Sequence, residues 1–95
     1  MSSLITGLII NFAKRRGLDI EVLTAEELNS HADQVWFYDE KNESEPVLIY
    51  NDQGNFLQYR TALMNGLEDM PGTIMNRQQL QKMIDYVSDT LKAQA

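Results

Sequence analysis

The chain contains 95 residues, with fourteen acidic and eight basic side chains, one histidine and no cysteine, and its formal net charge is −6. This length predicts one compact domain that spans residues 1–95. Without cysteine the sequence has no disulfide, no cysteine-ligated zinc and no thiol catalysis, and a single histidine excludes multi-histidine metal sites. The acidic balance argues against direct binding to nucleic acid phosphates.

The first amphipathic segment is expected to be a helix over residues 3–16. Apolar side chains recur every four residues in two adjacent rows, Leu4, Leu8 and Phe12 in one and Ile5, Ile9 and Ala13 in the other. The basic run Lys14-Arg15-Arg16 and then Gly17 suit a helix end. The basic run follows the apolar residues, which is the reverse of the order in a secretory signal. The apolar run is also too short to span a bilayer. We therefore expect a cytoplasmic protein with no membrane partner, in which this segment is a core helix; the alternative is a helix that lies on a membrane surface.

The next part of the chain predicts a strand, a short helix and a second strand. Residues 18–22 alternate between apolar and acidic side chains, which is typical of a strand with one buried face. Thr24 and Glu27 have the spacing of a capping box and predict a helix from Ala25 to about His31. Residues 34–40 contain four strand-forming side chains in a row, Val35, Trp36, Phe37 and Tyr38, and predict the second strand.

Two more strands are expected on either side of a tight turn. Pro46 precedes the first strand, residues 47–50, and the second strand spans residues 55–60. Between them, a three-residue turn with a bulge at Gly54 sets the pairing of the two strands. The pairs predicted by that register are Tyr50 with Phe56, Ile49 with Leu57, Leu48 with Gln58, and Val47 with Tyr59.

The end of the chain predicts a short helix or turn over residues 61–67 and then a long final helix. Asn76 is the expected cap of the final helix, with Gln79 at its third position and an apolar pair, Met75 and Leu80, around the cap. Its apolar face contains Leu80, Met83, Ile84, Val87 and Leu91. The predicted fold is α+β: a small, mostly antiparallel sheet, in the order α-β-α-β-β-β-short α-α, packed against the N- and C-terminal helices.

One face of the predicted hairpin is a candidate binding surface. Directly paired residues share a face, so Val47, Ile49, Leu57 and Tyr59 are expected in the core, and Leu48, Tyr50, Phe56 and Gln58 on the other face. Trp36 or Phe37 would extend one face or the other. We interpret the second face either as a surface for a partner protein or a second copy of the chain, or as a surface that the short helices cover. The candidate partner-binding residues are Trp36, Leu48, Tyr50 and Phe56.

The negative charge is concentrated in the middle of the chain. Residues 17–69 contain twelve acids and two bases, a local net charge of −10, whereas residues 1–16 are at +3 and residues 70–95 at +1. Asp39, Glu40, Glu43 and Glu45 cluster in one predicted loop, and Asp52 lies in the next turn. This region is either an ordinary solvated surface or one that attracts a protein with a basic surface. The narrower form of the second interpretation is a phage- or plasmid-type inhibitor that imitates nucleic acid phosphates.

Motifs for catalysis or cofactor binding are absent from the sequence. The acidic loop lacks the spacing of a calcium loop, and the glycines are too dispersed for a phosphate-binding loop. His31 has no recognisable nucleophile beside it in the sequence. We predict no metal and no cofactor, and a small acidic, non-enzymatic domain that regulates another protein through the sheet face or the acidic loop. The alternative is a homodimeric small-ligand-binding protein or enzyme, which a pocket with buried acids near His31 would favour.

Overall fold

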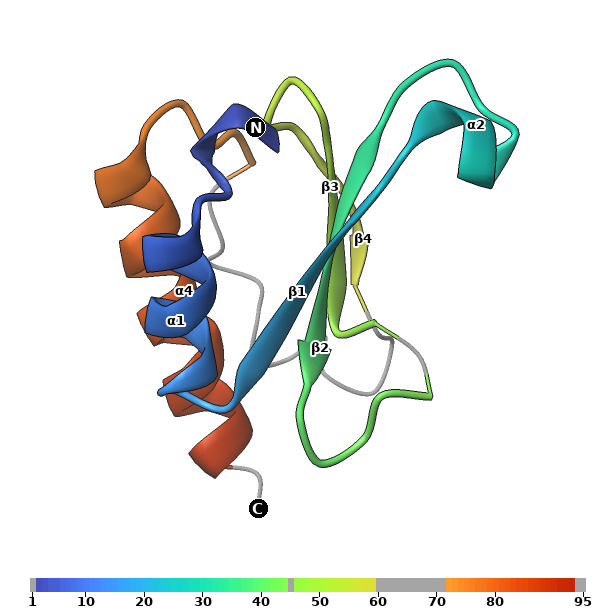
Figure 1. Ribbon diagram of the computed structural model, residues 1–95. Helices are drawn as coiled ribbons and strands as arrows, with labels where there is room; N and C mark the ends of the chain where they lie inside the picture. Colours follow the sequence, from blue (N-terminus) through green and yellow to red (C-terminus); the bar gives the residue numbers. More distant parts are fainter. Residues whose placement is uncertain (1, 45, 60–71, 94–95) are drawn as a thin grey trace.

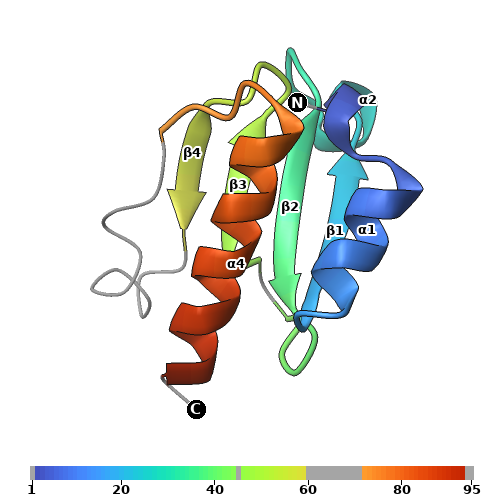
Figure 2. The ribbon, with the colours of Figure 1, turned by 90° about the vertical axis from the view of Figure 1, so that its left-hand side faces the viewer.

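The computed structural model describes residues 2–44, 46–59 and 72–93. Its elements are η1 (Ser2–Leu4), α1 (Gly7–Lys14), β1 (Leu18–Leu23), α2 (Ala25–Leu28), β2 (Gln34–Asp39), β3 (Leu48–Asn51), β4 (Phe56–Tyr59) and α4 (Arg77–Ala93). The strands form one antiparallel sheet in the order β1-β2-β3-β4, and α1 and α4 lie side by side on one of its faces (Figures 1 and 2). The predicted α+β class and order are therefore confirmed, while the short helix expected over residues 61–67 lies outside the described residues.

Helix α1 begins later than its apolar pattern predicts. Thr6 is extended, with φ −102° and ψ 171°, and its hydroxyl accepts a hydrogen bond from Ile9 N at 3.4 Å. A threonine in this conformation satisfies one of the free N–H groups of the first turn, so the helix starts at the next residue. At the other end Gly17 has φ +83°, which confirms the left-handed glycine expected there.

The capping box after β1 is present as predicted. The Thr24 hydroxyl accepts a hydrogen bond from Glu27 N at 3.2 Å, and the Glu27 carboxylate accepts one from Thr24 N at 3.3 Å. Asp33 adds a further cap, because its carboxylate accepts a hydrogen bond from Ala25 N at 2.8 Å. Helix α2 ends at Leu28, earlier than predicted, since Asn29 adopts the left-handed conformation with φ +52°.

The β3–β4 hairpin follows the predicted register only beside its turn. Gly54 is left-handed, with φ +87°, but a bulge shifts the strands by one residue further from the turn. Leu57 is 44% exposed, so its predicted place in the core is wrong. It was expected there as the partner of Ile49, but Ile49 lies opposite Trp36, on the face of the sheet turned away from the helices. The observed pairs are Tyr50 with Phe56, Ile49 with Gln58, and Leu48 with Tyr59.

The core lies between the sheet and the two long helices (Figure 2). Leu48 and Tyr50 are fully buried there, so the prediction that they lie on the face opposite the core is wrong. The reason is their pairing: Tyr50 lies opposite Val35 and Leu48 opposite Phe37, and directly paired residues share a face. The other buried core residues are Ile9, Ala13, Leu18, Val47, Ile74, Leu80, Met83, Ile84 and Val87.

Helix α4 is fastened to the end of α1. The predicted cap is present, since Asn76 Oδ1 accepts a hydrogen bond from Gln79 N at 2.9 Å. The predicted apolar contact of Met75 with Leu80 is not, because the Met75 side chain is 70% exposed. Ser88 is buried and its hydroxyl donates to the carbonyl of Arg16 at 2.7 Å.

The described helices include none that is both long and apolar enough to cross a membrane.

Candidate functional site

The face of the sheet turned away from α1 and α4 differs in composition from the core face. Side chains along a strand alternate between two faces, so the register defines the residues on this side. Asp19 lies directly opposite Tyr38, and Glu21 directly opposite Trp36, which makes carboxylates and aromatic rings cross-strand neighbours. We call the following set the outer sheet face: Asp19, Glu21 and Leu23 of β1, Gln34, Trp36 and Tyr38 of β2, and Ile49 and Asn51 of β3.

Two aromatic side chains form a pair on the outer sheet face. The ring centroids of Trp36 and Tyr38 are 6.3 Å apart and their planes are inclined by 44°. Both side chains are half-buried. The indole N–H of Trp36 donates to Gln34 Oε1 at 2.8 Å, which fixes the orientation of the larger ring. Partly exposed Trp and Tyr side chains with a satisfied polar atom are typical of surfaces that bind other proteins.

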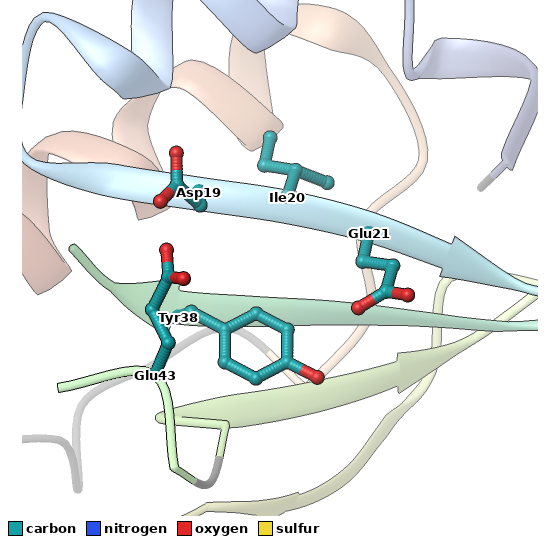
Figure 3. Close-up of a pocket in the computed structure, with 5 residues that line it drawn as sticks. All are labelled: Asp19, Ile20, Glu21, Tyr38 and Glu43. Atoms are coloured by element: carbon teal, nitrogen blue, oxygen red, sulfur yellow. The ribbon is translucent and has the colours of Figure 1, made fainter.

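A hollow of about 410 Å³ lies beside Tyr38, lined by Asp19, Ile20, Glu21, Tyr38 and Glu43. In Figure 3 the carboxylates of Asp19 and Glu43 point toward each other, and the Glu21 side chain lies near the hydroxyl end of the Tyr38 ring. Glu21 and Glu43 are both exposed, so the hollow is open to water. Three carboxylates therefore surround one tyrosine ring in a depression of the outer sheet face.

The acidic side chains around the hollow act on one another. The pKa of Glu43 is raised, first by its hydrogen bond with Asp19 and then by the negative charge of Asp19; Glu21 adds to this rise and Lys14 of α1 opposes it. The pKa of Tyr38 is also raised, by desolvation and by the charge of Glu21. Carboxylates this close to one another create a negative potential, which attracts a cation.

The structure separates the residues predicted for the sheet patch. Trp36 lies on the outer sheet face, whereas Leu48 and Tyr50 are buried beneath the helices. Phe56 belongs to β4, where its backbone pairs with Tyr50. Because Leu48 and Tyr50 are buried, the predicted patch does not form a surface for a partner or for a second copy of the chain.

The acids predicted to form one loop surface are also separated. Asp39 ends β2, and its carboxylate accepts a backbone hydrogen bond within the turn that follows. Glu40 is exposed, and Glu43 turns back toward β1 to line the hollow. Asp52 lies half-buried in the β3–β4 turn, and Glu45 lies outside the described residues. Among the described members of this group, Glu43 is thus the one that joins the outer sheet face.

Three residues of the site were missed by the sequence analysis: Asp19, Glu21 and Tyr38. A signal for the two acids was present, since the alternation in residues 18–22 places them on one face of the strand. Their proximity to Tyr38 and Glu43 depends on β2 pairing with β1 and on the return of the loop after β2, and neither is encoded in a local pattern.

The geometry offers no recognisable centre for metal chemistry in the described part of the chain. No group of three or more histidine, cysteine or acidic side chains could hold a metal ion among residues 2–44, 46–59 and 72–93. His31 is exposed between α2 and β2 and does not belong to the residues that line the hollow. Comparison with protein-family models, with curated proteins and with solved structures finds no match for this chain.

Proposed function

We propose that this chain is a small, non-enzymatic domain of the cytoplasm that regulates another protein by binding it on the outer sheet face. The observation that supports this proposal most is the Trp36–Tyr38 pair, which lies on the opposite side of the sheet from the core. The proposal unites the two surfaces inferred from the sequence, because Trp36 of the sheet patch lies on this face and Glu43 of the acidic loop lines the hollow in it.

The aromatic pair supplies the binding energy in this account. Trp and Tyr side chains each present about 200 Å² of surface, and a partner that covers the exposed half of one ring buries about 100 Å². At about 25 cal/mol per Å² this contributes about 2.5 kcal/mol for each ring. Two neighbouring rings are enough to act as the energetic centre of a small interface.

The carboxylates determine which partner is favoured. Asp19 and Glu21 lie beside the aromatic pair, and Glu43 lies at its edge. Charged groups at the border of an interface mainly set specificity and association rate, so these acids favour a protein with a basic surface and disfavour nucleic acid.

The test compares capture of partner proteins from the native host by three forms of the chain: wild type, Trp36→Ala and Leu8→Ala. Leu8 is the matched control, because it is 69% exposed on α1 and lies away from the outer sheet face. Circular dichroism checks that both variants are folded. We expect a protein that wild type and Leu8→Ala retain and that Trp36→Ala loses, and calorimetry with that purified protein then gives the affinity. Equal retention by all three forms would count against the outer sheet face as the binding surface.

A further inference from the structure

The charge on the outer sheet face is of one sign. Its ionisable acids are Asp19 and Glu21, with Glu43 beside them, and the set that defines the face includes no lysine or arginine. Lys14, the cation that lowers the pKa of Glu43, belongs to α1 and lies outside the face. The aromatic pair is therefore bordered by carboxylates that are not neutralised within the face itself.

This charge distinguishes between the possible occupants. A second copy of the chain, placed face to face, would bring the three carboxylates of each copy together and would be repelled. Nucleic acid and an anionic membrane surface are repelled for the same reason. A cationic protein segment is attracted, and its side chains also suit the rings, because an arginine guanidinium stacks on Trp and Tyr faces and pairs with two carboxylate oxygens at once.

The spacing of the acids matches an extended segment. Asp19 and Glu21 are two residues apart on one face of β1, so their Cα atoms are separated by about 7 Å along the strand. Side chains at alternate positions of an extended peptide have the same separation. Basic residues at alternate positions of such a peptide are thus able to meet successive acids while the residues between them point away.

We propose that the occupant of the outer sheet face is an extended segment of a partner protein with basic side chains at alternate positions. One of these side chains is an arginine, and it enters the hollow between Asp19, Glu21 and Glu43. This inference rests on the proposed function, since it names the partner's chemistry at the same surface. The guanidinium of this arginine stacks on the Tyr38 ring and forms ion pairs with the facing carboxylates of Asp19 and Glu43.

The test uses a short probe peptide with arginine at alternate positions and alanine between them. The control peptide has neutral citrulline, which has nearly the same shape, in place of each arginine. Trp36 is the single tryptophan of the chain, so its fluorescence reports binding at the outer sheet face directly. We expect a saturable change with the arginine peptide and none with the citrulline peptide. We also expect the affinity to fall when the ionic strength rises from about 0.01 M to about 0.15 M, because the screening length then falls from about 30 Å to about 8 Å.

Variants locate the interaction. Glu21→Gln and Glu43→Gln each keep the size of the side chain and remove one charge, and we expect each to weaken the arginine peptide by up to about fivefold, the upper range for an exposed ion pair. Asp89→Asn on α4 removes an exposed charge on the opposite side of the sheet and is expected to bind as wild type does. Equal binding of the two peptides, failure of both to bind, or equal affinities of Glu43→Gln and wild type would overturn the inference.

The outcomes separate this inference from the proposed function. If Trp36→Ala loses a captured protein while the arginine peptide fails to bind, the outer sheet face binds a partner and the basic segment is wrong. If light scattering shows a doubled mass that Trp36→Ala abolishes, the occupant is a second copy and the basic segment is again wrong. If the arginine peptide binds while every variant retains the same captured proteins, the face takes a basic segment but the regulatory partner binds elsewhere.

Discussion

Replacing Gly54 by alanine tests how closely the β3–β4 turn packs against the segment before α4. Gly54 has φ +87°, and a Cβ atom added there would lie 2.1 Å from the carbonyl oxygen of Ile74. The two residues also share a hydrogen bond, since Ile74 N donates to the Gly54 carbonyl at 2.7 Å. The clash is with backbone, so a rotamer change cannot relieve it and the two segments must separate.

The size of the effect follows from these contacts. A side chain in the left-handed conformation costs about 1 kcal/mol relative to glycine. Separation of the segments also loses the Gly54–Ile74 hydrogen bond, about 1 kcal/mol, and part of the burial of Ile74, about 1 kcal/mol more. Gly17→Ala is the matched control, because Gly17 has φ +83° but its added Cβ would be 3.6 Å from the nearest side-chain atom, of Glu40. We expect free energies of unfolding lower by about 3 kcal/mol for Gly54→Ala and about 1 kcal/mol for Gly17→Ala.

Urea unfolding, followed by circular dichroism, measures both variants against wild type. With a slope of about 1 kcal/mol per M, the midpoint falls by about 3 M for Gly54→Ala and about 1 M for Gly17→Ala. Since the φ angles are nearly equal, the difference between the two variants isolates the contact with Ile74. Equal losses would show that the turn does not pack on Ile74 as described, and the reasoning would be refuted.

Three further predictions use the same unfolding assay. Tyr50→Ala is expected to lower the free energy of unfolding by about 3–5 kcal/mol, because Tyr50 is fully buried; a loss below about 1 kcal/mol would place it at the surface instead. Thr24→Ala removes one half of the capping box with Glu27 and is expected to cost about 1 kcal/mol, and no change would show that the box is not formed in solution. Glu43→Gln is expected to be more stable than wild type at neutral pH and equal to it well below pH 4. The reason is that folding raises the pKa of Glu43 beside Asp19, so wild type loses stability as the pH rises through the folded-state pKa of Glu43, and the neutral Gln side chain does not. A Glu43→Gln variant less stable than wild type at neutral pH would contradict the raised pKa.

The parts of the fold that the sequence predicts well are those set by neighbouring residues. The capping box of Thr24 and Glu27 and the cap at Asn76 are present, because each depends on side chains within one helical turn. The left-handed glycine Gly17 ends the first helix for the same local reason. Apolar periodicity alone misplaces the start of this helix: it extends the helix back to residue 3, whereas the Thr6 cap starts it at Gly7.

The sheet faces depend on pairing between distant residues, and here the sequence is ambiguous. Residues 47–50 are all apolar or aromatic and are all buried, so they have no alternation from which to choose a core face. The wrong choice of core face then also placed Leu57, the predicted partner of Ile49, in the core, although Leu57 is 44% exposed. The hollow was missed for the same reason, because Asp19 and Glu43 are far apart in the sequence and meet through the turn after β2.

The most direct test of the outer sheet face is an NMR titration of the isotopically labelled chain with the arginine peptide. The account predicts that the largest chemical-shift changes occur at the indole N–H of Trp36 and at the backbone amides of Glu21, Tyr38 and Glu43. The amides of α4 that face the core are expected to change little, since they lie on the other side of the sheet. Largest changes on α1 or α4, with the Trp36 indole signal unmoved, would contradict the account.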